Sequence, residues 1–374
     1  MAPLTFILFL AGLVMLVGGA ELLVRGASRL ATALGIPALV VGLTVVAVGT
    51  SSPEIAVAIQ SSFNGQADIA LGNVVGSNIA NVLLILGLTA LVAPLVVPQL
   101  LIRQDVPIVI GVSALVFLLS LDGSLGRFDG ALLLGGIVAY IVFVVRQSRK
   151  ESARVKAEYQ AEFGVAQVHA TQGWPRSVAL ALVGLGLLIV GASWLVDGAV
   201  AFARVLGVSE LIIGLTVVAV GTSLPEVATS MLASLRGERD IAVGNVVGSC
   251  IFNLLLVLGL MALIAPSGVP VPVAARNFDM PVMLVTAVAC LPIFINGHTI
   301  YRWEGGLFLG YYASYTCYLL LASSQHALLA PFSLIMLYFV IPLTAVTLAI
   351  VLFRSLSAQR RVISQPPLVD NDTP

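Results

Sequence analysis

The feature that most constrains this chain is an internal duplication. Residues 42–91 align without a gap with residues 214–263, and 33 of the 50 positions are identical. The same offset of 172 residues pairs Gly19 with Gly191 and Gly26 with Gly198 upstream of the copied segment. Two related structural units are therefore expected, and they must pack against each other.

Composition decides the solvent in which these units fold. Only 10% of the 374 residues are charged and 59% are hydrophobic, whereas soluble domains carry about 25% charged residues. A soluble fold is excluded, and the zero net charge gives no field that would attract nucleic acid. A bilayer core about 30 Å thick needs about 20 helical residues. The apolar runs predict eleven spans, at residues 4–24, 38–63, 69–92, 106–121, 128–145, 178–202, 211–235, 241–265, 280–295, 303–322 and 328–353.

Each copy covers five of these spans. Because five is odd, the second copy must enter the membrane from the opposite side, which makes the copies an inverted repeat. The predicted fold is an all-α polytopic membrane protein with two inverted-topology five-helix repeats and one extra C-terminal transmembrane helix. Its divisions are a first repeat (1–147), a cytoplasmic loop (148–176), a second repeat (177–322), the extra helix (323–353) and a disordered cytoplasmic tail (354–374).

The distribution of basic residues predicts the orientation. With the N-terminus outside and the C-terminus in the cytoplasm, 15 of the 18 Lys and Arg residues lie on the cytoplasmic side. This is the bias that membrane proteins show.

Two acidic residues, Glu54 and Glu226, lie about midway along their spans, at equivalent positions of the two copies. A carboxylate at this depth costs about 2.5 kcal/mol or more unless it has a partner or a proton. Every Lys and Arg lies at a span edge or outside the spans, so a buried ion pair is not expected. Of the remaining alternatives, permanent protonation and a bound cation, we favour a cation that both carboxylates bind.

Each glutamate follows a proline, in the motifs SSPE (51–54) and SLPE (223–226). The spacing of Ser, Pro and Glu is typical of a helix start with a capping box, which predicts a break in mid-membrane. Proline removes a donor and crowds the carbonyl four residues back. Carbonyl groups without their usual partners are therefore expected at Ala47, Gly49, Thr50, Ala219, Gly221 and Thr222. With hydroxyl and carboxylate oxygens they would suit Na+ or Ca2+; the alternative is a proline kink that only bends the helix.

The next span of each copy carries the motif GNVVGS, at 72–77 and 244–249. Its two glycines are expected to permit close helix packing. Asn81 follows Ser77 by four residues and Asn253 follows Ser249 by four, so each pair shares a helical face. These polar side chains either complete the coordination of the cation or hydrogen-bond the helices together.

Other polar and sulfur-containing residues suggest no chemistry. Glu21 and Arg25 are four residues apart and are expected to pair. The three cysteines lie in apolar segments and are expected to pack as small hydrophobic residues. The histidines form no metal cluster or catalytic dyad in the sequence, so an enzyme is not expected.

The paired signatures GTSSPE with GNVVGSNIAN, and GTSLPE with GNVVGSCIFN, resemble those of the cation/calcium exchanger superfamily, specifically the compact prokaryotic sodium/calcium exchangers. The resemblance covers both five-helix halves. It implies a ten-helix core in which ions bind between the second, third, seventh and eighth helices, while the first and sixth helices slide across that bundle.

The resemblance also implies the ligands. Glu54 and Glu226 would be central ligands shared between Na+ and Ca2+, and the carbonyls of Thr50 and Thr222 would complete the calcium site. Further sodium ligands would lie at or near Ala47, Ser51, Ser77, Asn81, Ala219, Ser223 and Ser249. Some members have an aspartate where this chain has Asn253, so here the site holds at most two negative charges and the stoichiometry stays open.

The function implied by the resemblance is secondary antiport of Na+ against Ca2+ without a cofactor, in a prokaryotic plasma (inner) membrane. Exchange of Ca2+ against H+, exchange that also needs K+, and a cation channel are alternatives. The sequence leaves the oligomeric state open.

Overall fold

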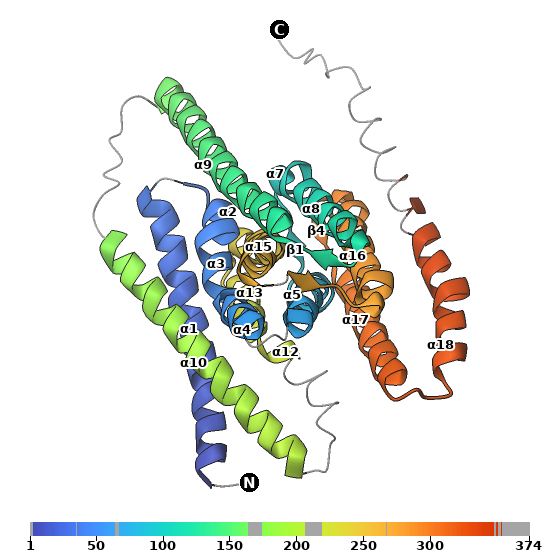
Figure 1. Ribbon diagram of the computed structural model, residues 1–374. Helices are drawn as coiled ribbons and strands as arrows, with labels where there is room; N and C mark the ends of the chain where they lie inside the picture. The colour runs from blue at the N-terminus through green and yellow to red at the C-terminus, as the bar shows by residue number, and fades with distance from the viewer. Residues whose placement is uncertain are drawn as a thin grey trace.

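Helices make up nearly all of the described chain (Figure 1). Eight described helices are long and apolar enough to cross a membrane, and a ninth span results when a bent helix pair is counted as one. The protein is thus an integral membrane protein of the all-α class, as the sequence predicts. The computed structural model describes residues 3–34, 36–63, 67–163, 174–205, 219–266, 268–347, 349–350 and 353.

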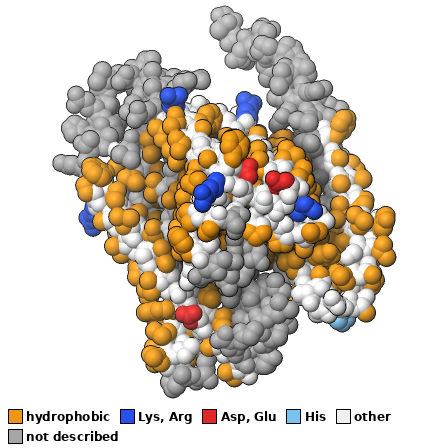
Figure 2. Space-filling model, in the orientation of Figure 1, with side chains coloured by type: hydrophobic (Ala, Val, Ile, Leu, Met, Phe, Trp, Pro, Cys, Tyr) orange, Lys and Arg blue, Asp and Glu red, His pale blue; other side chains and the backbone are white. Residues whose placement is uncertain are grey.

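The molecular surface agrees with this assignment. Hydrophobic side chains cover most of the described face in Figure 2, and charged side chains are scattered over it. Exposed phenylalanine, valine and leucine side chains, such as Val14 and Phe128, would be unfavourable in water and are favourable against lipid.

The first half of the chain contains the following elements: α1 (Pro3–Leu34), α2 (Ala38–Val41), a π-helical turn (Gly42–Val46), α3 (Ala47–Thr50), α4 (Ser52–Phe63), α5 (Ala67–Ala80), a π-helical turn (Asn81–Leu86), α6 (Gly87–Val92), β1 (Leu95–Val96), α7 (Gln99–Arg103), α8 (Asp105–Leu119), a 3-10 turn (Ser120–Asp122), β2 (Ser124–Leu125) and α9 (Arg127–Phe163). The last of these helices continues beyond the predicted end of the fifth span at residue 145, so the start of the segment 148–176 is helical.

The second half contains the following elements: α10 (Trp174–Val205), α12 (Ala219–Gly221), α13 (Leu224–Leu235), α14 (Arg239–Phe252), a π-helical turn (Asn253–Val257), α15 (Leu258–Ile264), β3 (Val269–Pro270), a π-helical turn (Ala275–Asp279), α16 (Met280–Ile295), β4 (Thr299–Ile300), α17 (Arg302–Ser323), α18 (Leu329–Ile335) and a π-helical turn (Met336–Val340). The predicted seventh span, 211–235, lies partly outside the described residues. The predicted tenth span coincides with α17, which is less apolar than the eight helices counted above.

Helices α4, α5 and α13 lie near the centre of the molecule (Figure 1), and α14 packs against α13 and α5. Helix α14 is buried on all sides, since every residue from Ile241 to Phe252 is buried. At the periphery, α18 lies beside α17 and has no buried residue. The four central helices are the segments that carry the duplicated motifs.

Helices α1 and α10 lie side by side along one flank (Figure 1) and touch through their glycines. A Cβ atom added to Gly184 would lie 2.5 Å from the backbone nitrogen of Leu23 and 2.7 Å from the carbonyl oxygen of Gly19. Gly12 and Gly191 approach in the same way, with 2.8 Å from each added Cβ to the other residue's carbonyl oxygen. Glycine here allows backbone-to-backbone contact, so the two helices form one closely packed pair.

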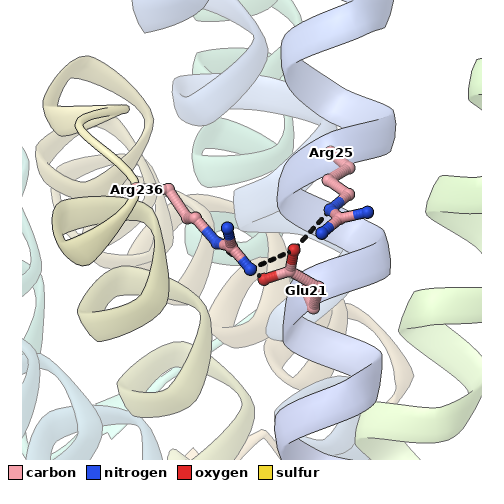
Figure 3. A network of polar contacts seen from close by, with 3 residues as sticks. All are labelled: Glu21, Arg25 and Arg236. Carbon is pink, nitrogen blue, oxygen red and sulfur yellow. Dashed lines mark hydrogen bonds and ion pairs between the residues drawn. The ribbon is translucent and has the colours of Figure 1, made fainter.

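A polar network connects α1 to the end of α13 (Figure 3). Glu21 accepts from Arg25 one turn away, as the sequence predicts. It also binds Arg236, with 2.6 Å from Nη2 to Oε1 and 3.0 Å from Nε to Oε2. Ser28 donates to Glu238 at 2.6 Å. The contacts of Glu21 with Arg236 and of Ser28 with Glu238 join residues more than 200 positions apart.

Two short antiparallel sheets connect the halves. In one, Leu95 pairs with Ile300 and Val96 with Thr299; in the other, Ser124 pairs with Pro270 and Leu125 with Val269. Each sheet takes one strand from each half. The strands β1 and β2 are separated by the single span α7–α8, so the sheets lie at opposite faces of the membrane.

An acid bonds to a tyrosine in each half, away from the centre; Asp105 is buried and Asp279 is half-buried. Tyr140 donates to Asp105 at 3.0 Å, and Tyr315 donates to Asp279 at 2.9 Å. Both bonds join the helix pair that ends its half, α8–α9 and α16–α17. They show that the duplication extends to side-chain contacts outside the copied segment.

Candidate ion-binding site

The helix break predicted at SSPE is present. The segments Ala38–Thr50 and Ser52–Phe63 meet at Ser51 with a bend of 43°. In the second copy, α12 ends at Gly221 and α13 begins at Leu224, with Pro225 in its first turn. Both breaks interrupt a helix within an apolar span, where irregular backbone is tolerated only if protein, a polar cavity or an ion covers it; Ser51 and Ser223 are fully buried.

The two glutamates lie just after these breaks and contact the opposite copy. Ser51 donates to Oε1 of Glu226 at 3.0 Å, and Ser223 donates to Oε1 of Glu54 at 3.5 Å. Both carboxylates are about 1% exposed and interact electrostatically with each other. Each copy therefore supplies a carboxylate to the other copy's break, and the glutamates share one buried site.

The predicted capping box is absent from the second copy. Ser223 is the N-cap residue of α13, but its side chain makes no capping bond. Its hydroxyl is directed across the interface to Glu54 and also lies 3.5 Å from the Ser77 hydroxyl. The spacing identified the helix start correctly, but tertiary packing gives the serine another partner.

The prediction is also wrong for two carbonyls, those of Ala47 and Gly49, which both accept backbone N–H groups at the end of α3. The Ala47 carbonyl keeps its helical partner, because Ser51 N–H donates to it at 3.1 Å. Pro53 removes the N–H that would bond to the Gly49 carbonyl four positions before it, but that carbonyl accepts another backbone N–H at the end of α3. In the second copy Ser223 N–H donates to the carbonyl of Val220. This bond spans three residues instead of four, so that turn is tighter.

The partner helices bring their polar face to the same place. Asn81, Ser249 and Asn253 are at most 1% exposed, and none of their side-chain polar atoms has a hydrogen-bond partner within the described ranges. The second carboxylate oxygens of Glu54 and Glu226 also lack partners there. Buried polar atoms are normally satisfied, and a bound cation would satisfy these unpaired oxygens.

Both asparagines begin a π-helical turn, over Asn81–Leu86 and over Asn253–Val257. Such turns interrupt the regular backbone ladder and occur frequently at functional sites. The wide turn is present at the same position of both copies, as the duplication would require.

The glycines of the second GNVVGS motif have the predicted packing role. A Cβ on Gly248 would lie 2.7 Å from the Leu43 carbonyl oxygen, and a Cβ on Gly244 would lie 2.9 Å from that of Leu39. Close contact presses α14 against α2 and the π-helical turn after it. The residues that would face Gly72 and Gly76 by the repeat symmetry, 211–215, lie outside the described part of the chain.

Two further asparagines were given no role by the sequence analysis. Thr50 donates to Asn245 at 3.1 Å, and Thr222 donates to Asn73 at 3.3 Å. Both bonds cross between the copies. The signal was present, because Asn73 and Asn245 lie four residues before Ser77 and Ser249 on the same helical face.

Within the described part of the chain, no basic side chain neutralises the site. Among the described residues, the ion pairs involve Glu21 with Arg25 and Arg236, and neither Glu54 nor Glu226 has a Lys or Arg partner. The same part of the chain holds no group of three or more His, Cys, Asp and Glu residues that would bind a transition metal. The arrangement is an oxygen-rich, doubly acidic site, which suits a hard cation.

Comparison with known proteins identifies the family. The family described as "Sodium/calcium exchanger protein" matches residues 4–148 and 176–321, which together make up more than half of the chain. The chain belongs to this family. It is therefore a transporter and not an enzyme, which confirms the prediction from the sequence, and the predicted resemblance is confirmed as well.

Several relatives agree with this membership. The chain is 42% identical over 280 residues to the putative antiporter CaxA of Alkalimonas amylolytica, covering 74% of this chain and 85% of the relative. It is 40% identical over 242 residues to the inner membrane protein YrbG of Escherichia coli, covering 64% and 73%. It is 32% identical over 297 residues to the sodium/calcium exchanger MaX1 of Methanosarcina acetivorans, covering 71% and 84%.

A solved structure shares the fold. The sodium-calcium exchanger NCX_Mj, soaked with 2.5 mM Na+ and 0.1 mM Ca2+, superimposes with a TM-score of 0.71 at 30% sequence identity. The match covers 84% of this chain and 97% of the other. The exchanger fold is thereby confirmed.

Proposed function

We propose that this protein is a secondary antiporter that exchanges Na+ for Ca2+ by alternating access, with the ions bound between Glu54 and Glu226. The supporting observation is that two buried carboxylates from opposite copies share one site in which no Lys or Arg of the described chain neutralises them. The charge that completes the site must then be mobile. Because the chain belongs to a family of sodium/calcium exchangers, Na+ and Ca2+ are the ions that we expect to bind there.

The ligand set has two halves related by the duplication. Around the carboxylates, the carbonyls of Thr50 and Thr222 and the serine hydroxyls would bind the ion, and the unpaired amide oxygens would complete its sphere. The Ala47 carbonyl has a second lone pair beside its helical bond and can still contribute. The full set is Ala47, Thr50, Ser51, Glu54, Ser77, Asn81, Ala219, Thr222, Ser223, Glu226, Ser249 and Asn253.

We also propose the setting of this site. The protein has two inverted five-helix repeats, with its N-terminus outside and its C-terminus in the cytoplasm of a prokaryotic inner membrane. The bias of basic residues supports the orientation, and the inner-membrane relative from Escherichia coli supports the compartment. The helix α18 lies outside the matched residues and would be an addition to the ten-helix core.

Calcium uptake into liposomes tests the proposal. Purified protein is sealed into vesicles, and labelled Ca2+ uptake is followed while outward gradients of Na+, K+ and H+ are imposed in turn. The Na+ gradient is expected to drive uptake, and the others are not. Uptake that ignores the Na+ gradient would refute the coupling.

Removal of either charge provides the second test. Glu54→Gln and Glu226→Gln are each expected to lower exchange by more than tenfold, because one remaining carboxylate cannot balance Ca2+. Asp105→Asn is the matched control, since Asp105 is equally buried but bonds to Tyr140 away from the site. Wild-type exchange in either glutamine variant would remove that glutamate from the site.

A second candidate is exchange of Ca2+ for protons. It is favoured by the amides at Asn81 and Asn253, which leave two carboxylates as the site's only acids. Two protons on these carboxylates would replace one Ca2+ without change in charge. In this case the pH gradient alone would drive uptake in the same vesicles.

A further inference from the structure

We propose that Asn245 and Ser230 are positioning residues that hold the Thr50 side of the ion site rigid, while the Thr222 side, whose Asn73 lacks the second hydrogen bond within the described chain, yields more. This inference rests on the ion site proposed above and adds to it a difference between its two halves. The difference lies in one hydroxyl group that the duplication did not preserve.

On the Thr50 side of the site, two hydrogen bonds join three buried side chains in series. Thr50 donates to Oδ1 of Asn245 at 3.1 Å, and Nδ2 of Asn245 donates to Oγ of Ser230 at 3.0 Å. All three residues are 0% exposed. The asparagine is therefore bonded at both ends of its amide in an environment without competing water, and its orientation is fixed.

The chain connects three elements. Thr50 is the last residue of α3, Asn245 belongs to α14 and Ser230 belongs to α13. The amide thus ties the break of the first copy to two helices of the second copy. A change in the relative position of these elements would strain both bonds.

The equivalent chain in the other half is incomplete. Thr222 donates to Oδ1 of Asn73 at 3.3 Å, which mirrors the first bond. At the position equivalent to Ser230 the first copy has Ala58, whose methyl group accepts no hydrogen bond. Accordingly, Nδ2 of Asn73 is buried and has no partner within the described chain.

This difference acts on the ligands through the backbone. The carbonyl of Thr50 is a proposed calcium ligand, and the next residue, Ser51, donates to Glu226. Fixing the Thr50 side chain therefore fixes the peptide group between Thr50 and Ser51. An ion held by preorganised oxygens binds more tightly than one that must order them.

The test is Ser230→Ala, which gives the second copy the same residue as the first. Wild-type and variant proteins in sealed vesicles are compared for the half-saturating concentrations of Ca2+ and Na+ and for maximal rate. The loss of one buried hydrogen bond is expected to raise the half-saturating Ca2+ concentration about three- to tenfold. The maximal rate is expected to change by less than about twofold, because the carboxylates are unaltered.

Ser234→Ala is the matched control. Ser234 lies one turn further along α13, is buried and has a hydroxyl without a partner among the described residues. Its removal is expected to leave both half-saturating concentrations unchanged. An equal shift in the two variants would show that the effect comes from repacking α13 and would overturn the proposal.

A double-mutant cycle tests whether Ser230 acts through the amide. Asn245→Ala removes both bonds, so adding Ser230→Ala to it is expected to cause no further shift. Additive shifts would overturn the proposal, as would an unchanged half-saturating concentration in Ser230→Ala. Absence of cation-driven calcium uptake in the wild-type protein would instead refute the proposed function, so the two failures are distinguishable.

Discussion

The contact between α1 and α10 predicts a large effect from a single methyl group. In Gly184→Ala the new Cβ would lie 2.5 Å from the nitrogen of Leu23 and 2.7 Å from the oxygen of Gly19. Ordinary contacts of this kind are 3.4 Å or longer, so the two backbones must separate by about 1 Å. Overpacking of this extent typically costs about 1–3 kcal/mol.

The separation would also weaken the contacts that depend on close approach along the rest of the pair. Gly12 and Gly191 lie further along the same helix contact. A Cβ atom added to either one would lie 2.8 Å from the carbonyl oxygen of the other. We expect the melting temperature of the purified protein in detergent to fall by about 5 °C, on the scale of 2–4 °C per kcal/mol for domains of moderate size. Differential scanning fluorimetry measures this shift.

Gly186→Ala is the internal control. Gly186 is exposed, two residues further along α10, and a Cβ there meets no described atom within 4 Å. Alanine is the better helix former by about 1 kcal/mol, so this variant should melt at or above the wild-type temperature. Equal melting temperatures for the two variants would refute the close-packing argument.

Three further outcomes are expected. Asn253→Asp adds a third negative charge to the site and should increase the number of Na+ ions exchanged per Ca2+. This number is obtained from the membrane potential at which exchange reverses. An unchanged reversal potential would place Asn253 outside the site. Mg2+ should inhibit or replace Ca2+ poorly in the vesicle assay, because it gives up its water reluctantly; transport at the Ca2+ rate would contradict a dehydrated site. Glu21→Gln should lower the free energy of unfolding by about 1 kcal/mol or less, because both arginines that bind Glu21 are half-exposed. High salt should reduce the difference in stability between the variant and the wild type. A large loss that does not depend on salt would assign Glu21 a different role.

The sequence predicts those features that depend on local pattern or on the duplication. Apolar runs of membrane-spanning length locate the helices, and proline beside a buried acid locates the breaks. The equivalence of Glu54 and Glu226 follows from the constant offset. The pairing of Arg25 with Glu21 follows from their spacing on one helix.

The sequence could not predict contacts that arise only when the copies pack. Ser51 and Ser223 have the spacing of capping residues, yet each donates to the glutamate of the other copy. The bond between Glu21 and Arg236 joins residues 215 positions apart, and no periodicity indicates it. The bonds of Asn245 with Thr50 and Ser230 could not be predicted either. A local sequence pattern shows that a polar side chain is present but not which residue it bonds to.

The two small sheets restrict how this transporter can change shape. Each one joins the halves through backbone hydrogen bonds, at opposite faces of the membrane. A hinge that parted the halves at either surface would have to break such a ladder. Shape changes that preserve both ladders are compatible with the sliding of the first and sixth helices that the family resemblance implies, here α1 and α10. We then expect the bond between Glu21 and Arg236 to break and re-form in every transport cycle.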